Sequence, residues 1–134
     1  MRARSILPMI GAAIFPFSAM AATPFPAGYE AAYQAYARAL KVAGETAPWL
    51  TQLNGVSSQP AMIRVGGRPM LYLFACRNHA CDANNVNLFL APDRKSFRAV
   101  LRTRGAQTLL GGAGAIELAC VRKAEAAGGV MESC

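Results

Sequence analysis

The sequence predicts an α+β domain: a central antiparallel β-sheet of about four to five strands with helices packed on one face. Three observations predict this fold. A helical apolar period runs through residues 28–43, strand-like alternation broken by turn residues follows over residues 61–103, and a second helical stretch covers residues 115–127. The chain has 134 residues, which is enough for one domain and too few for two.

The first residues form a separate unit that is typical of a secretory signal peptide. Two arginines precede an apolar run from Ile6 to about Phe17, and Ala19-Met20-Ala21 gives the small-x-small pattern at which signal peptidase cleaves. The run is shorter than the roughly 20 residues that a membrane-spanning helix needs, and two prolines interrupt it. We therefore expect a signal peptide over residues 1–21, a single mature domain over residues 22–134, and a periplasmic protein that is free of the membrane after cleavage.

Four residues of the first predicted helix form one apolar stripe: Tyr29, Tyr33, Tyr36 and Leu40. They stand at i, i+4, i+7 and i+11, so they share one face of a helix. Alanines, which favour helix, fill much of the remainder, and Gly44 suits the position after the last helical residue. We interpret the stripe as a face that packs into the core, in preference to a platform that stacks a ligand.

The first predicted hairpin joins the strand Ala61–Val65 to the strand Pro69–Cys76 through Gly66-Gly67, a sequence typical of a two-residue turn. The second of these strands is apolar on both of its faces. Such a strand is typical of a central position in a sheet, where both sides are covered.

The second predicted hairpin begins at Val86 and passes through the turn Pro92–Lys95 to the strand Phe97–Thr103. The glycine-rich stretch that follows is expected to be irregular. It leaves room for a fifth strand at the edge of the sheet, near Leu109–Leu110 or Val130–Met131. The second helix then ends at a glycine pair, which is a typical helix stop.

Basic residues outnumber acidic ones. The signal peptide holds two of the 14 Lys and Arg residues and none of the seven Asp and Glu residues, so the mature chain has 12 against seven. This balance favours acidic partners, but no Lys/Arg run exceeds two residues, and we expect no nucleic-acid partner. Three arginines share one face of the last strand: Arg98, Arg102 and Arg104. We interpret this arginine row as a solvated sheet face and not as a site.

All four cysteines, Cys76, Cys81, Cys120 and Cys134, lie in the mature chain. An even number of cysteines in an exported chain predicts two disulfides, and four cysteines allow three pairings. We favour Cys76–Cys81 and Cys120–Cys134, because the members of each pair are near in sequence. The second pair would tie the tail to the last helix, with a stabilisation of about 3 kcal/mol in the chain-entropy model.

The candidate site is the segment Cys76-Arg77-Asn78-His79-Ala80-Cys81, which holds the only histidine in the chain. A disulfide between its cysteines would pinch a small rigid loop beyond the end of a buried strand, with the histidine near its tip. A metal site of two thiolates and the histidine is disfavoured, because exported thiols usually oxidise and only three ligands are near. The C-x4-C spacing also differs from that of thiol oxidoreductases. We therefore expect a structural disulfide, with no metal or other cofactor.

This loop resembles the Cys-Lys-Pro-His-Asp-Cys signature of the Ivy family, the periplasmic inhibitors of vertebrate-type lysozyme. Cys76, His79 and Cys81 stand at the matching positions. The similarity extends over roughly residues 32–121. It includes a Pro/Trp segment at Pro48-Trp49-Leu50, the hairpin before the loop, and a looser match at Leu109-Leu110-Gly111 to a Trp-Leu-Gly element before the last helix.

The resemblance implies an inhibitor of c-type lysozyme and not an enzyme. In this family the rigid loop enters the active-site cleft and its histidine reaches the catalytic carboxylates. By this resemblance His79 is the main inhibitory residue, with Arg77, Asn78 and Ala80 beside it. The chemistry is reasonable, because the cleft of a retaining glycosidase holds two carboxyl groups about 5 Å apart, and an imidazole donates hydrogen bonds to such groups.

The loop departs from the family signature at three positions. Ala80 replaces the family's Asp, and Arg77-Asn78 replaces its Lys-Pro. Because animal lysozymes are basic like this chain, long-range repulsion would slow their encounter. The alternative is therefore a periplasmic interaction module that acts on a related muramidase, such as the bacterium's own lytic transglycosylases, without lysozyme inhibition. The family resemblance is also compatible with a homodimer.

Overall fold

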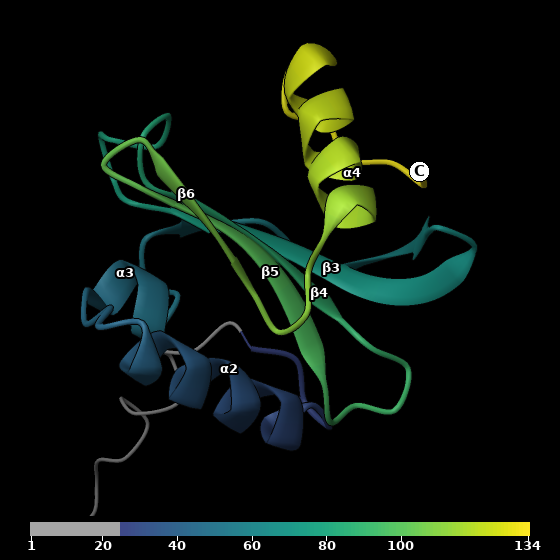
Figure 1. The fold of residues 1–134 in the computed structure, drawn as a ribbon, viewed down its shortest axis with the longest axis horizontal. Coiled ribbons are helices and arrows are strands. Elements are labelled where there is room, and N and C mark those ends of the chain that lie inside the picture. The colour runs from purple at the N-terminus through teal and green to yellow at the C-terminus, as the bar shows by residue number, and fades with distance from the viewer. Residues whose placement is uncertain (1–24) are drawn as a thin grey trace, which may run out of the picture.

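The computed structural model describes residues 25–134, so the expected signal peptide lies outside the described residues. A six-stranded antiparallel sheet has helices on both of its faces (Figure 1). In chain order, the elements are α2 Glu30–Val42, α3 Pro48–Thr51, β1 Val56–Ser57, β2 Ala61–Val65, β3 Arg68–Cys76, β4 Asn85–Leu90, β5 Phe97–Thr103, β6 Ala106–Leu110 and α4 Ala115–Ala126. Within this part of the chain, none of the helices is both long and apolar enough to cross a membrane.

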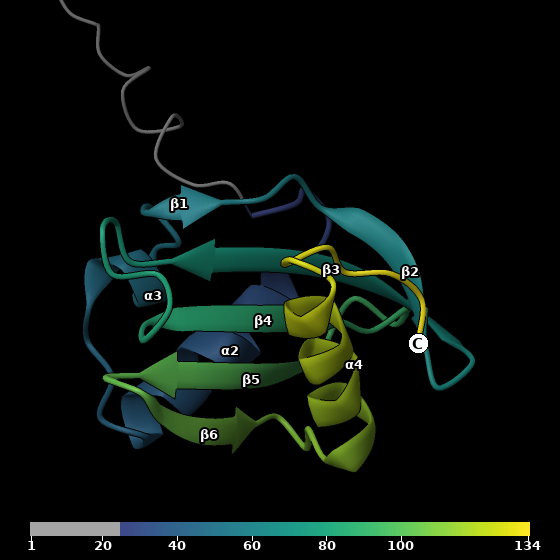
Figure 2. The same cartoon turned by 90° about the horizontal axis from the view of Figure 1, so that it is seen from above.

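The sheet has the strand order β1-β3-β4-β5-β6, and β2 pairs with β3 on the same edge as β1 (Figure 2). The α+β class is confirmed. The expected edge strand near Leu109–Leu110 is β6, whereas Val130–Met131 forms no strand. β1 was not predicted, because two residues are too few to show an alternation.

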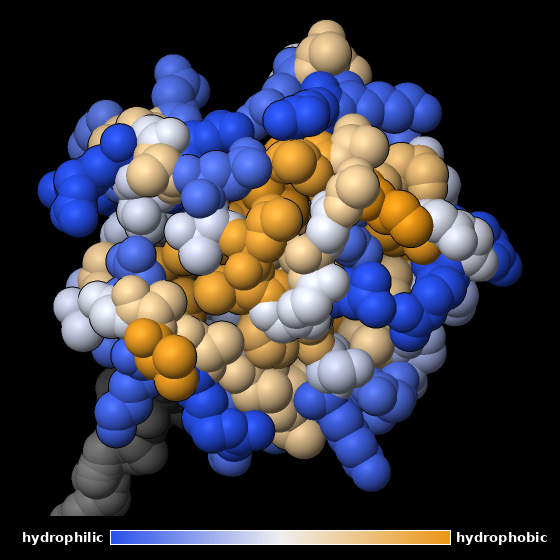
Figure 3. All heavy atoms as spheres, viewed as in Figure 1, coloured by the Kyte–Doolittle hydropathy of each residue, from blue (hydrophilic) through white to orange (hydrophobic). Residues whose placement is uncertain are grey.

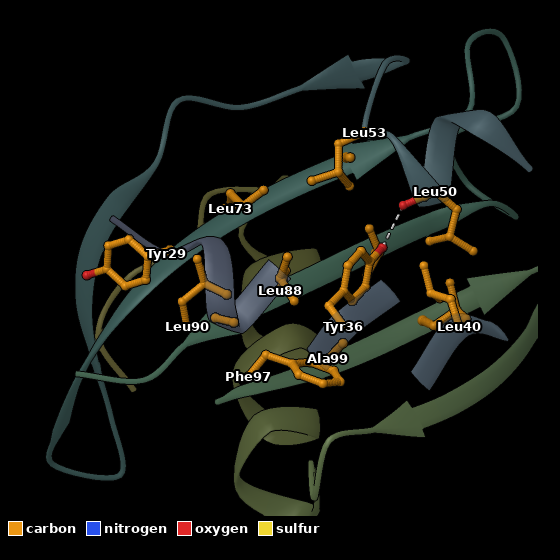
Figure 4. Packing of buried hydrophobic residues seen from close by; sticks show 14 of the residues in the cluster. Tyr29, Tyr36, Leu40, Leu50, Leu53, Leu73, Leu88, Leu90, Phe97 and Ala99 are labelled. Carbon is orange, nitrogen blue, oxygen red and sulfur yellow. Dashed lines mark hydrogen bonds between the residues drawn. The ribbon is translucent and has the colours of Figure 1, made fainter. Parts of the chain in front are cut away.

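The first face of the sheet is covered by α2 and α3. Tyr36 and Leu40 of the predicted stripe are fully buried against strand residues such as Leu88 and Leu101. The Tyr36 hydroxyl donates to the Leu50 carbonyl oxygen at 2.8 Å, which ties α2 to α3 (Figure 4). Burial raises the pKa of Tyr36, so this hydroxyl stays a neutral donor. The stripe is thus a core face.

The second face of the sheet is covered by α4, which stands on the opposite side from α2 in Figure 1. Cys120 and Val121 of α4 pack with Tyr72, Phe89 and Val100 of the three central strands. The prediction that the helices pack on one face is therefore wrong. The reason is that β3 and β4 carry buried residues on both faces, and each face needs its own cover.

The arginine row faces α4. Arg98 Nη1 lies 3.1 Å from Glu117 Oε2, and Arg102 Nη1 lies 2.8 Å from Glu125 Oε2. Residues 117 and 125 are eight positions apart, so they share one face of the helix. The interpretation of the row as a solvated face is therefore wrong for Arg98 and Arg102, which join α4 to the sheet. Arg104 lies beyond β5, in the turn to β6.

The C-terminal tail is fixed along the outer edge of β2. A disulfide joins Cys120 of α4 to Cys134. The Cys134 backbone N–H donates to the Arg64 carbonyl oxygen, and its carbonyl accepts from the Gly66 N–H, both at 2.8 Å. The tail therefore covers strand-edge groups that would otherwise be open to pairing.

Candidate functional site

The candidate loop connects β3 to β4 at one end of the sheet, over residues 77–84 (Figure 1). A disulfide joins Cys76, the buried last residue of β3, to Cys81. Arg77, Asn78 and His79 are exposed, and Ala80 is half-buried. The predicted loop residues therefore form the projecting part of the segment, and the two cysteines fix its base.

His79 lies at the tip of a tight turn. The Ala80 N–H donates to the Arg77 carbonyl oxygen at 3.0 Å, and His79 has a φ of +63°. A positive φ at the third of four residues is the pattern of a type II turn, where glycine or asparagine is favoured. Histidine is among the side chains that tolerate this region better than most, but the conformation still costs free energy. The surrounding contacts must therefore hold the turn in place.

Two nearly buried asparagines provide those contacts. Asn84 Nδ2 donates to the Ala80 carbonyl oxygen at 3.2 Å. Asn85 Nδ2 donates to the carbonyl oxygens of Cys81 at 2.8 Å and Asp82 at 3.3 Å. The Arg77 N–H also donates to the Asn84 carbonyl oxygen at 3.0 Å, which closes the base of the loop. The loop is thus fixed before any partner binds.

Sequence reasoning did not identify these asparagines as site residues. The available signal was two consecutive asparagines directly before a buried apolar strand, where a polar side chain needs a local partner. Gly55 also supports the base of the loop, because a Cβ there would collide with the Cys76 carbonyl oxygen. Only glycine lets the chain before β1 approach the base of the loop so closely.

A second turn lies beside the loop. The Gly105 N–H donates to the Ala83 carbonyl oxygen, and the Arg104 N–H donates to Asn84 Oδ1, both at 3.0 Å. In Figure 1 the β5–β6 turn and the loop project together at the same end of the sheet, and Figure 3 shows hydrophilic side chains over that end. The candidate surface therefore has two neighbouring segments.

The chemistry of this surface suits binding by charge and hydrogen bonds. Within residues 25–134, the side chains of Arg77, His79 and Arg104 have no hydrogen bond or ion pair. No group of three or more His, Cys, Asp or Glu residues in that part of the chain could hold a metal ion. The surface offers donors to another molecule and assembles no nucleophile with a base.

A fixed, disulfide-closed loop on a small α+β fold is a feature of preorganised binding proteins, among them protein inhibitors. None of the curated proteins compared with the chain matches it. A family model described as inhibitor of vertebrate lysozyme (Ivy) matches residues 32–123. The chain belongs to the Ivy family, which confirms the resemblance drawn from the sequence, and the matched range includes the whole candidate loop.

Proposed function

We propose that this protein is a periplasmic inhibitor of c-type lysozyme that fills the active-site cleft with the Cys76–Cys81 loop. The observation that carries the proposal is the loop itself, which is exposed at its tip and fixed at its base within a chain of the Ivy family. A loop that is already ordered loses little conformational entropy on binding. The inhibitor is not cleaved, because it offers the enzyme no glycosidic bond.

His79 is the residue that reaches the catalytic carboxyl groups. Its ring is exposed at the tip and has no partner in the described part of the chain, so its N–H groups are available to an external acceptor. A lysozyme cleft holds one ionised and one protonated carboxyl group. Hydrogen bonds to an ionised carboxylate are stronger than those between neutral groups, so the cleft offers His79 a favourable environment. Arg77 adds a positive charge beside it.

A second target is favoured by two observations. The family's carboxylate is missing at Ala80, and the mature chain is basic like animal lysozymes. Both features weaken binding to a basic enzyme and not to a less basic one. The second candidate function is therefore regulation of a related muramidase, such as a lytic transglycosylase of the same cell.

The test is an inhibition assay with the oxidised protein over residues 22–134, run in parallel against a c-type lysozyme and a lytic transglycosylase on cell-wall substrate. We expect inhibition of lysozyme that is lost on His79→Gly, a change that keeps the positive φ. Inhibition of the transglycosylase alone would move the function to the second target. Activity of both enzymes at saturating protein would contradict the proposal.

A further inference from the structure

The β5–β6 turn is built into the same rigid unit as the inhibitory loop. The side-chain amide of Asn84 donates to Ala80 beside the tip histidine and accepts from the backbone N–H of Arg104. Its two bonds, 3.2 Å and 3.0 Å long, place the two segments on either side of one buried group. The bond from Gly105 to Ala83 adds a second connection. The turn therefore moves with the loop.

Arg104 occupies an unusual backbone position in that turn. Its φ is +50°, and Gly105 follows with a φ of +82°. Two successive residues with positive φ define a turn type in which glycine, asparagine and aspartate are favoured. An arginine there is held against its own backbone preference. Such an outlier on an exposed loop motivates a functional hypothesis for its side chain.

The charge of Arg104 is also left without a partner. Arg98 and Arg102 of the preceding strand are paired with glutamates of α4. The Arg104 side chain has no hydrogen bond or ion pair within residues 25–134, and the Arg77 side chain on the neighbouring loop has none either. Across residues 77–84 and 104–105, Asp82 is the one acidic residue. The end of the sheet thus presents two guanidinium groups without a partner in the described part of the chain, one on the loop of the tip histidine and one on the adjoining turn.

We propose that the Arg104 turn is the second half of the binding surface, and that its guanidinium contacts acidic side chains on the rim of the target's cleft while the loop fills the cleft. This inference rests on the proposed function. A stable protein–protein interface typically buries about 800 Å² on each partner, more than one short loop supplies. The adjoining turn is the structure joined to the loop by hydrogen bonds. A cation at the rim acts mainly by steering association.

The test compares Arg104→Gly, Arg104→Lys and the control Arg68→Ala. Arg68 is an exposed arginine without a side-chain partner in residues 25–134, at the opposite end of β3 from the loop. Glycine accepts the positive φ, so Arg104→Gly should unfold no more easily than the parent protein. At low ionic strength its association rate with lysozyme should be about 3- to 10-fold lower than that of Arg68→Ala, which has the same net charge, and the difference should shrink at high salt. Arg104→Lys and Arg68→Ala should associate at nearly the parent rate.

The outcomes separate the two proposals. If the parent protein binds lysozyme and Arg104→Gly associates no more slowly than Arg68→Ala, the second contact is refuted and the loop mechanism stands. If the parent protein binds no muramidase, the proposed function fails and this inference falls with it. A second measurement needs no variant. The Arg104 side-chain Nε resonance should shift in the complex with lysozyme while that of Arg68 stays, and an unshifted Arg104 would also overturn the proposal.

Discussion

His79 combines an exposed ring with a left-handed backbone, and each property points to a different cause. Exposure of a polar ring at a loop tip is ordinary, but a positive φ costs a histidine free energy that a glycine would not lose. Selection for stability alone would therefore favour glycine or asparagine here. The side chain, and not the backbone, is the reason to expect a histidine at this position.

We predict that His79→Gly separates stability from inhibition. Glycine adopts the observed φ of +63° without strain, so the free energy of unfolding should stay within about 1 kcal/mol of the parent value. Inhibition should weaken by at least about 30-fold, which corresponds to roughly 2 kcal/mol for a central interface residue. Denaturant unfolding and a lysozyme inhibition titration measure the two effects. Equal loss of stability and inhibition would show a structural role instead.

Asn85 supports the loop by hydrogen bonds to its backbone. The residue is 7% exposed and its amide donates to two loop carbonyl groups, so Asn85→Ala would leave both without this donor. We predict a loss of about 1–3 kcal/mol in the free energy of unfolding, together with weaker inhibition. Because Asn85 is buried and offers a target little surface, the weaker inhibition would arise from the altered loop. The exposed Asn54→Ala is the control and should change neither quantity. A parent-like Asn85→Ala would mean that the disulfide alone fixes the loop.

At the scale of elements, the strands were the most predictable part. The hairpins at Gly66-Gly67 and Pro92–Lys95 join the strands that the sequence predicts, and the strand Phe97–Thr103 has the predicted bounds. The placement of the helices was harder. The apolar pattern of β3 and β4 shows that two faces are buried, but which helix covers which face depends on connections that periodicity does not describe.

The β4–β5 turn supplies a pH-dependent contribution to stability. Asp93 Oδ1 accepts from the backbone N–H groups of Lys95 at 2.8 Å and Ser96 at 3.0 Å, and these bonds hold the pKa of its carboxyl below the ordinary value. A lowered pKa in the folded state gives stability that is present above the unfolded pKa of about 3.9 and is lost as pH falls through the folded value.

We therefore predict that parent and Asp93→Asn proteins differ in unfolding free energy by a constant amount above about pH 5. The difference should shrink steadily below about pH 4, because protonation makes the parent carboxyl resemble the amide. Denaturant titrations across this range measure it. A difference that grows as the pH falls would contradict a lowered pKa of Asp93 in the folded protein.

At the scale of the whole molecule, the two disulfides have different roles. Cys76–Cys81 spans five positions of sequence and Cys120–Cys134 spans 14. In the chain-entropy model the longer loop restricts the unfolded chain more and so stabilises the fold more. The shorter one lies at the base of the candidate loop, where its larger effect is on the shape presented to a partner.

We predict that removing the Cys120–Cys134 disulfide costs more stability, whereas removing the Cys76–Cys81 disulfide costs more inhibition. Cys120→Ser with Cys134→Ser should lower the free energy of unfolding by about 2–3 kcal/mol and leave inhibition nearly intact while the protein is folded. Cys76→Ser with Cys81→Ser should cost less stability and more inhibition. Calorimetry and inhibition titrations at 10 °C, where both variants are expected to be folded, give the ranking. If the same double replacement caused the larger loss in both assays, the two disulfides would not have these separate roles.

The sequence predicted the candidate loop but not the structures that hold it. The cysteine spacing and the lone histidine are local, and they mark the loop directly. The support from Asn84, Asn85 and the Arg104 turn depends on contacts across up to 22 positions, which no local pattern encodes. For the same reason the sequence groups Arg104 with its strand neighbours, although the structure places it in the turn after their strand.

If the loop occupies the lysozyme cleft, the protein and a saccharide that fills the cleft must compete for the enzyme. Binding of the oxidised protein to a c-type lysozyme would be measured with the cleft empty and with it saturated by a trisaccharide of N-acetylglucosamine. We expect mutually exclusive binding, with an apparent Kd that rises in proportion to saccharide concentration. Simultaneous binding, with an unchanged Kd in saturating saccharide, would show that the loop lies elsewhere and would contradict the account.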